Sequence, residues 1–410
     1  MRHFHFHTIA IVLILLVDVY LFFVLKYFTH NATPKLRLAI LLAHCIISIA
    51  CIACVCLMGR LPDSIQNYVI SIVFGILIAK LLAIIFFLAD DIRRGIFWAI
   101  KKIFFRKPDA ASVSDNSISR SAFLSWLGTV VGGGFLATFL YGFRNKYNYQ
   151  VKQIKINFPN LPNAFKGLKI LQLSDIHSGS FTNKQAVNNG ISLALRQKPD
   201  LILFTGDLVN ELAVEVLNYQ DIFSRLSAPM GVFSVLGNHD YGMYHPWKSD
   251  KEEAKNLEHL KKIEAEMGWR LLMNEHIIFE RNGEKIALIG IENWSASKRF
   301  PKFGKLDVAY AGTENIPFKI LMSHDPTHWD AQVRPQYSDI DLTLSGHTHG
   351  MQFGVETPHF KWSPIQWVYE EWAGLYQKGK QYLYVNRGFG FIGYPGRVGI
   401  LPEITVIELV

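Results

Sequence analysis

The hydrophobic pattern of this chain changes near residue 145. Before that point long apolar runs dominate, and after it short apolar runs alternate with polar, turn-rich segments. Four of the long runs reach the roughly 20 residues that a helix needs to cross a bilayer. They cover residues 8–28, 37–57, 68–88 and 122–142. We therefore predict a membrane domain of about four transmembrane helices over residues 1–145 and a separate globular domain over residues 146–410.

The globular part alternates between strand-like and helix-like segments. Five short apolar runs have the length and composition of buried strands, namely residues 168–173, 201–205, 232–236, 318–322 and 342–344. Helical periodicity covers residues 183–197, 211–226 and 251–267, and further strand-like runs lie at residues 285–291, 382–386 and 403–409. This alternation predicts an α/β fold with a strand-rich C-terminal end.

A polar motif follows each of the five apolar runs. In chain order the motifs are Asp175-Ile176-His177, Gly206-Asp207, Gly237-Asn238-His239-Asp240, His324 and Gly346-His347-Thr348-His349. Strand ends meet at one edge of a sheet, where α/β folds bind ligands. A lone buried Asp or His is usually a satisfied core residue, but carboxylates, imidazoles and a carboxamide in this register are ligands for divalent metals. Together the motifs predict a two-metal phosphoester hydrolase site.

The order of these motifs resembles that of the calcineurin-like metallophosphoesterase family, from about residue 168 to the C-terminus. The likeness is strongest to its membrane-attached bacterial members, which the segment Tyr384-Val385-Asn386-Arg387-Gly388 also resembles. The chain departs from the usual pattern at Gly350-Met351-Gln352, where a second glycine is common, and this touches no expected ligand. The resemblance implies a four-layer α/β sandwich, in which helices flank two mixed β-sheets on both sides.

The resemblance also implies which residues hold the metals. Asp175, His177, Asp207 and His349 would hold one divalent ion, and Asp207, Asn238, His324 and His347 the other. The ions would be Mn, Fe or Zn, bridged by Asp207, because two dications about 3.5–4 Å apart need a shared anion between them. A metal-bound hydroxide would attack the phosphorus. His239 would stabilise or protonate the leaving group, and Asp240 would orient His239 or a ligand.

Charge is distributed unevenly along the chain, whose net charge is +8. The loop expected at residues 89–121 carries most of the excess, through Arg93, Arg94, Lys101, Lys102, Arg106, Lys107 and Arg120. The positive-inside rule places this loop in the cytoplasm and the catalytic domain on the extracytoplasmic face of a bacterial cell (inner) membrane. The sequence has no basic stripe with interleaved aromatic residues, which argues against nucleic-acid binding. We expect Asp18 and Lys80, which lie within the spans, to pair with each other.

Two aromatic-rich stretches, residues 241–247 and 360–376, bear on the substrate. They either contact acyl chains and headgroups beside the site or pack in the core and loops. Because the catalytic domain is tethered to the membrane, the leading hypothesis is hydrolysis of a lipid- or envelope-linked phosphoester. The alternatives are pyrophosphate hydrolysis of a nucleotide-linked lipid, as in the related UDP-diacylglucosamine hydrolases, and a non-catalytic metal-binding sensor or scaffold. Nothing in the sequence indicates an oligomeric state.

Overall fold

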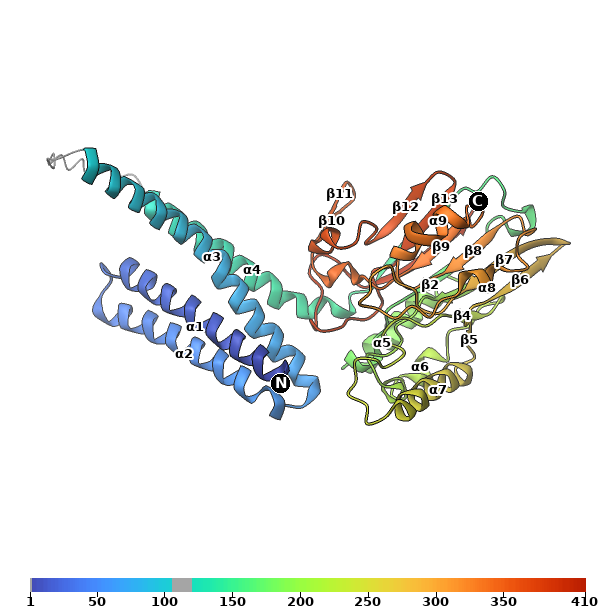
Figure 1. The fold of residues 1–410 in the computed structure, drawn as a ribbon, viewed down its shortest axis with the longest axis horizontal. Coiled ribbons are helices and arrows are strands. Elements are labelled where there is room, and N and C mark those ends of the chain that lie inside the picture. The colour runs from blue at the N-terminus through green and yellow to red at the C-terminus, as the bar shows by residue number, and fades with distance from the viewer. Residues whose placement is uncertain (1, 105–119) are drawn as a thin grey trace. The chain divides into compact units, whose positions relative to one another are not determined.

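The computed structural model describes residues 2–104 and 120–410 (Figure 1). The chain divides into two compact units, Met1–Tyr141 and Gly142–Val410. The first unit is built from apolar helices and the second from sheets and helices.

The first unit, blue to blue-green in Figure 1, contains the four helices α1 (Arg2–Phe28), α2 (Pro34–Leu57), α3 (Asp63–Phe104) and α4 (Arg120–Tyr141). Each includes a segment that is long and apolar enough to cross a membrane, so the prediction of four candidate spans is confirmed. α2 begins at Pro34 because proline suits the first helical turn and the Thr33 hydroxyl accepts the Leu36 N–H.

α3 extends well beyond the span predicted at residues 68–88, and part of the basic segment expected as a loop continues the helix to Phe104. Ion pairs between successive turns support this extension. Arg93 and Arg94 lie 2.7 and 3.1 Å from the two carboxylate oxygens of Asp90. The end of an apolar run therefore does not mark the end of its helix. Arg106 and Lys107 of the expected loop lie outside the described residues.

The predicted pairing of the two charged residues within the spans is confirmed. The Nζ atom of Lys80 on α3 lies 2.6 Å from Oδ1 of Asp18 on α1, and both side chains are mostly buried in the helix bundle. His44 of α2 places its Nε2 atom 3.0 Å from the Asp18 carbonyl oxygen. Burying opposite charges together avoids the cost of an unpaired charge in an apolar medium.

The second unit contains two six-stranded mixed sheets and a separate hairpin. The first sheet has the order β1 (Gln150–Ile156), β14 (Glu403–Leu409), β2 (Lys169–Leu173), β3 (Leu201–Phe204), β4 (Val232–Ser234) and β5 (Arg270–Leu271). The second has the order β12 (Gly374–Lys378), β13 (Gln381–Val385), β9 (Leu342–Ser345), β8 (Lys319–Met322), β7 (Glu284–Gly290) and β6 (Glu275–Arg281). The hairpin pairs β10 (Val355–Thr357) with β11 (Phe360–Trp362).

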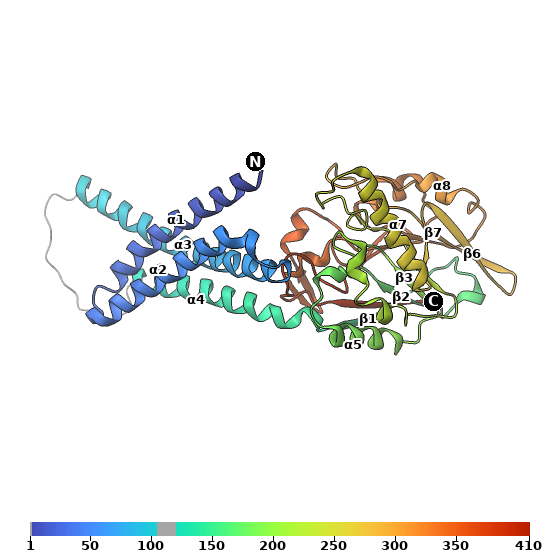
Figure 2. The ribbon, with the colours of Figure 1, turned by 90° about the horizontal axis from the view of Figure 1, so that it is seen from below.

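Three apolar cores separate the four layers of this unit. The core between the sheets contains residues of both, including Leu203 of β3 and Ile320 of β8. On the outer face of the first sheet, a core that includes Ile202 packs against α5 (Lys184–Leu195), α6 (Gln220–Phe223) and α7 (Asp250–Glu266). A third core packs α8 (Leu306–Tyr310) on the second sheet. Figure 2 shows α5 and α7 beside β1, β2 and β3. The predicted four-layer α/β sandwich is therefore confirmed.

The single helix predicted over residues 211–226 is wrong, because this segment forms two short turns, η5 (Ala213–Val216) and α6. The Glu215 carboxylate accepts the backbone N–H groups of Asn210 and Leu212 at 2.6 and 3.0 Å, which caps the start of the first turn. The chain then leaves helical geometry at Tyr219, where φ is −126° and ψ is −1°.

Candidate metal centre and active site

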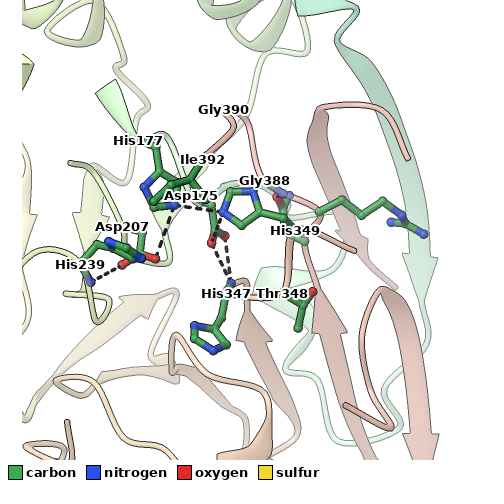
Figure 3. Close-up of polar contacts among 12 residues, drawn as sticks. Asp175, His177, Asp207, His239, His347, Thr348, His349, Gly388, Gly390 and Ile392 are labelled. Carbon is green, nitrogen blue, oxygen red and sulfur yellow. Dashed lines mark hydrogen bonds and ion pairs between the residues drawn. The ribbon is translucent and has the colours of Figure 1, made fainter. Parts of the chain in front are cut away.

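The predicted site residues converge at the C-terminal ends of five strands. Asp175 and His177 follow β2, Asp207 follows β3, and Asn238 follows β4, which are parallel neighbours in the first sheet. His324 follows β8, and His347 and His349 follow β9, which are parallel neighbours in the second sheet. The side chains therefore meet where the two sheets face each other, and Figure 3 shows most of them in one cluster.

Five of these residues have a left-handed backbone. The φ angles of Asp175, His177, Asp207, His347 and His349 lie between 49° and 71°. Residues other than glycine rarely adopt this conformation, and it persists where the surrounding structure enforces it. Here the loops turn sharply at each strand end, which aims successive side chains at one point.

Two motif glycines provide the space that the carboxylates occupy. A side chain at Gly237 would clash with the carboxylate of Asp207, and a side chain at Gly346 would clash with the carboxylate of Asp175. Gly346 thus lets the Asp175 oxygens accept the His347 N–H at 2.9 and 3.0 Å. The glycine in each motif is required for packing against a ligand from another loop.

The first group of candidate ligands comprises Asp175, His177 and His349. The Nε2 atoms of the two imidazoles face each other at 3.0 Å, and His349 Nε2 lies 3.2 Å from Asp175 Oδ1. Burial lowers the pKa of His177 to about 3 and holds the pKa of His349 well below its usual value. Both rings are therefore neutral at pH 7. Two lone pairs and a carboxylate directed at one point fit a divalent cation.

The second group comprises Asp207, His324 and His347. Asp207 Oδ2 lies 3.1 Å from His324 Nε2, and His324 Nε2 lies 3.3 Å from His347 Nδ1. The same Asp207 oxygen is 3.6 Å from His177 Nε2 in the first group. One carboxylate oxygen thus lies between the two groups.

The charge of Asp207 dominates the electrostatics of the second group. Burial alone would raise its pKa, but the imidazoles of His324 and His239 hold that pKa well below the usual value. Burial alone would lower the pKa of His324, but the Asp207 carboxylate raises it to about 10. The space between the Asp207 carboxylate and the His324 ring therefore favours a positive charge, which a proton or a metal cation can supply.

Asn238 supports the metal assignment independently. Its Nδ2 donates to the Tyr244 hydroxyl at 3.0 Å, whereas its Oδ1 is buried and has no hydrogen-bond partner among the described residues. A buried carbonyl oxygen without a partner is costly. A cation at the C-terminal end of β4 would bind this oxygen. The residues present therefore fit the metals that the motifs predict.

Partners outside the motifs fix the imidazole orientations. The Thr205 carbonyl accepts the Nδ1–H of His324 at 2.7 Å, which leaves Nε2 facing Asp207 as the nitrogen that would bind a cation in place of a proton. His347 is held at its Nε2 by the Tyr369 hydroxyl at 2.9 Å, which leaves Nδ1 facing His324. Tyr369 was not predicted individually, and its place in the aromatic stretch was the only signal for it.

Asp240 and His239 have different surroundings. The buried Asp240 carboxylate accepts the backbone N–H groups of Asp207, Leu208 and Gly237 at 2.7–2.8 Å, so it ties the β3 and β4 loops together. His239 is one-fifth exposed and donates its Nδ1–H to the Asn210 carbonyl at 2.7 Å. Burial lowers the pKa of His239, but Asp207 and Glu211 raise it to about 9. The described contacts of Asp240 do not include the His239 ring.

A cavity of about 590 Å³ opens onto both groups of ligands. Besides motif residues, its lining includes Ser297, Arg299, Phe300, Thr327, Ile365, Val368, Tyr369 and Ile392. Arg299 provides a cation near the imidazoles, and Phe300 contacts the His347 ring edge-on with centroids 4.7 Å apart. The lining therefore mixes polar ligands with apolar side chains such as Ile365, Val368 and Ile392. Arg299 and Phe300 carried no motif in the sequence and were not predicted.

Comparison with known families agrees with this geometry. Residues 168–351 match the family described as calcineurin-like phosphoesterase, and residues 1–146 match the family described as a probable calcineurin-like phosphoesterase transmembrane domain. Converging carboxylate and imidazole ligands, a shared carboxylate oxygen and candidate membrane spans define a membrane-associated, metal-dependent phosphoester hydrolase.

Three relatives show how far the similarity extends. The metallophosphoesterase YkuE of Bacillus subtilis (strain 168) is 29% identical over 71% of this chain and 98% of its own length. The phosphodiesterase YaeI of Escherichia coli (strain K12) is 30% identical over 59% of this chain and 82% of its own. A transmembrane protein with a metallophosphoesterase domain from Danio rerio is 31% identical over 63% of this chain and 57% of its own. The chain belongs to the calcineurin-like metallophosphoesterase family, as the motifs indicated.

Proposed function

We propose that the chain hydrolyses phosphoester bonds with two divalent cations, Mn, Fe or Zn, held by the two groups of ligands. The observation that supports this most strongly is the position of Asp207 Oδ2, 3.1 Å from His324 Nε2 and 3.6 Å from His177 Nε2. A carboxylate between two cations reduces their repulsion. Asp175, His177, Asp207 and His349 would hold one cation, and Asp207, Asn238, His324 and His347 the other.

When bound, such cations polarise a phosphoryl oxygen and make a nucleophile available from water at neutral pH. The chain's own residues would assist the leaving group and position the ligands. His239 lines the cavity and its Nδ1 is fixed by Asn210, so its other ring nitrogen is free to stabilise or protonate the departing oxygen. Asp240 is a positioning residue that fixes the loops carrying Asp207 and Asn238. This full ligand set disfavours a scaffold role.

We infer a lipid- or envelope-linked phosphoester as the substrate class. The cavity is lined by candidate metal ligands and Arg299 together with the apolar side chains of Ile365, Val368 and Ile392, which suits a phosphate joined to an apolar group. The candidate spans of the first unit hold the catalytic unit at a bilayer, which raises its encounter rate with such molecules.

Metal-dependent turnover is the direct test of this function. The full chain, purified in nanodiscs and stripped with EDTA, is expected to lose hydrolysis of bis(p-nitrophenyl) phosphate and to regain it with Mn, Fe or Zn added separately. Activity that survives complete stripping, verified by elemental analysis, would exclude the proposed chemistry. p-Nitrophenyl phosphate measured in parallel separates monoesterase from diesterase preference.

Sidedness is a second testable part of the proposal. Basic residues favour the cytoplasmic side of a membrane, and α3 carries Arg93, Arg94 and Lys102 in its C-terminal part. If that end of α3 is cytoplasmic and α4 crosses the membrane once, the catalytic unit lies on the extracytoplasmic face of a bacterial inner membrane. Alkaline phosphatase fused after Val410 should be active, and the same reporter fused after Pro108 should be silent. The reverse pattern would place the site in the cytoplasm and favour pyrophosphate hydrolysis of a nucleotide-linked lipid, since nucleotide-activated precursors are made there.

A further inference from the structure

The hairpin of β10 and β11 exposes its apolar face and turns its charged face toward the protein. Val355 pairs directly with Trp362, and Phe360 lies two residues before Trp362, so all three side chains are on one face of the hairpin. Val355 and Phe360 are exposed, by 47% and 57%. The face that looks away from the protein is therefore the apolar one.

The charged face of the same hairpin is turned toward the protein. Glu356 pairs with Lys361 in the hairpin register. The Glu356 carboxylate binds Arg387 at 2.9 Å and Lys152 at 3.2 Å, and the Lys361 ammonium donates to the Tyr376 hydroxyl at 3.0 Å. A hairpin on a water-exposed surface has the opposite arrangement, with its apolar face on the core.

The apolar face continues into the segment after β11. Trp367 packs edge-on against Trp362, with ring centroids 6.0 Å apart. Among the large apolar side chains of residues 142–410, Trp367, Val368 and Phe360 are the most exposed, and Trp367 reaches 74%. Val355, Phe360, Trp362 and Trp367 form what we call the hairpin patch. Exposed apolar clusters of this kind mark interaction sites.

The hairpin patch lies near the point where the catalytic unit begins. Gly142 follows the last residue of α4, and its carbonyl accepts the Arg397 N–H at 2.9 Å. The next residue, Val398, donates to the Gln352 carbonyl at 2.8 Å and accepts the Gly354 N–H at 2.9 Å. Gly354 leads directly into β10. The junction with a candidate membrane span and the base of the hairpin are thus neighbours within the catalytic unit.

We propose that the hairpin patch docks into the lipid bilayer at the boundary between headgroups and acyl chains. Tryptophan and phenylalanine favour this boundary, and the bilayer is the apolar medium to which the candidate spans already attach the chain. Because the spans hold the protein at the membrane in any case, docking sets the orientation of the catalytic unit rather than its membrane affinity.

Docking would present the cavity to lipid. Ile365 and Val368 line the cavity next to the hairpin patch, and the following residue, Tyr369, binds the ligand His347. An amphiphile could then place its phosphoester at the metal ligands while its acyl chain stays in the bilayer. This part of the inference rests on the proposed function, whereas docking itself does not.

Two substrates with the same scissile bond test the catalytic consequence. Ethyl p-nitrophenyl phosphate stays in water, and hexadecyl p-nitrophenyl phosphate partitions into the bilayer. The full chain in nanodiscs is compared with Phe360→Ser/Trp367→Ser, which alters neither a metal ligand nor a residue of the cavity wall. The exposed Val308 on α8 gives a matched control, Val308→Ser.

The double variant is expected to hydrolyse the hexadecyl ester about tenfold more slowly, because it lacks the two aromatic side chains that docking would bury in the bilayer. It should hydrolyse the ethyl ester at the rate of the wild-type chain, and Val308→Ser should match the wild type on both. Equal losses on both esters, or no loss on the hexadecyl ester, would overturn the inference.

Fluorescence quenching tests docking without any turnover. The difference in emission between the wild-type chain and Trp367→Phe isolates Trp367, and brominated phospholipids in the nanodisc should quench that difference. An unquenched Trp367 would overturn docking into the bilayer. The same result is expected if a second protein, and not lipid, covers the patch. Quenching without hydrolysis of either ester would instead refute the proposed function and leave docking standing.

Discussion

Replacing Asp207 by asparagine is expected to lower turnover by at least about a thousandfold, because the variant removes the only charge shared by both groups of ligands. The Asp207 carboxylate accepts the backbone N–H of His239 at 2.9 Å. The amide oxygen of an asparagine can accept the same hydrogen bond, so we expect the loop geometry to be kept. The expected loss therefore reflects the missing charge between two cations. Elemental analysis should show that at least one of the two metals is lost.

Asp221→Asn is the matched control for this substitution. Asp221 is an exposed aspartate on the helical side of the same sheet, where it pairs with Lys184 at 2.9 Å, and its carboxylate is remote from the ligands. This variant should retain both metals and the wild-type rate. Two bound metals and near-normal turnover in Asp207→Asn would refute the shared role of Asp207.

The strands and the convergence of the motif residues were predictable because both leave local marks in the sequence. The five strands that precede the motifs are almost entirely buried, so each reads as a short continuous apolar run, as Leu201–Phe204 does. A parallel sheet brings its strand ends to one edge. Polar residues that follow several such runs must therefore meet, whatever the lengths of the connections between them.

The environment of the ligands was not predictable in the same way. Arg397 is fully buried, and its guanidinium donates to the carbonyl oxygens of His349 and Arg387 at 3.3 and 2.7 Å. Nothing near Arg397 in the sequence marks it, because its partners are distant along the chain. Arg299 and Tyr369 reach the site in the same way, from loops whose paths depend on tertiary packing.

Local patterns also failed where a helix is interrupted or prolonged. The periodicity expected over residues 211–226 is broken at Tyr219, where φ is −126° and ψ is −1°, so two short turns replace one helix. The opposite error occurred in α3, where the apolar run predicted at residues 68–88 ends but the helix continues to Phe104, with ion pairs to Asp90 between successive turns. Hydrophobic periodicity describes burial, and it does not fix where a helix begins or ends.

His239→Ala is expected to retain both metals and to lose rate according to the leaving group. The ring has no place in either group of ligands, and its Nδ1 is held by the Asn210 carbonyl at the edge of the cavity. Proton donation matters most for a poor leaving group. We expect a loss of about 10²–10⁴-fold on an alkyl phosphoester and a much smaller loss on a p-nitrophenyl ester, whose leaving group needs no proton.

The measurement is a series of phosphodiesters with leaving groups of increasing pKa, assayed with metal content determined for each protein. The dependence of rate on leaving-group pKa should be steeper for His239→Ala than for the wild-type chain. His259→Ala, which changes an exposed histidine on α7, should leave both the metals and the slope unchanged. An equal loss across the series would show that His239 does not serve the leaving group. Loss of metal from His239→Ala would instead make it a ligand, since removal of a residue that only assists departure leaves the ligand shells complete.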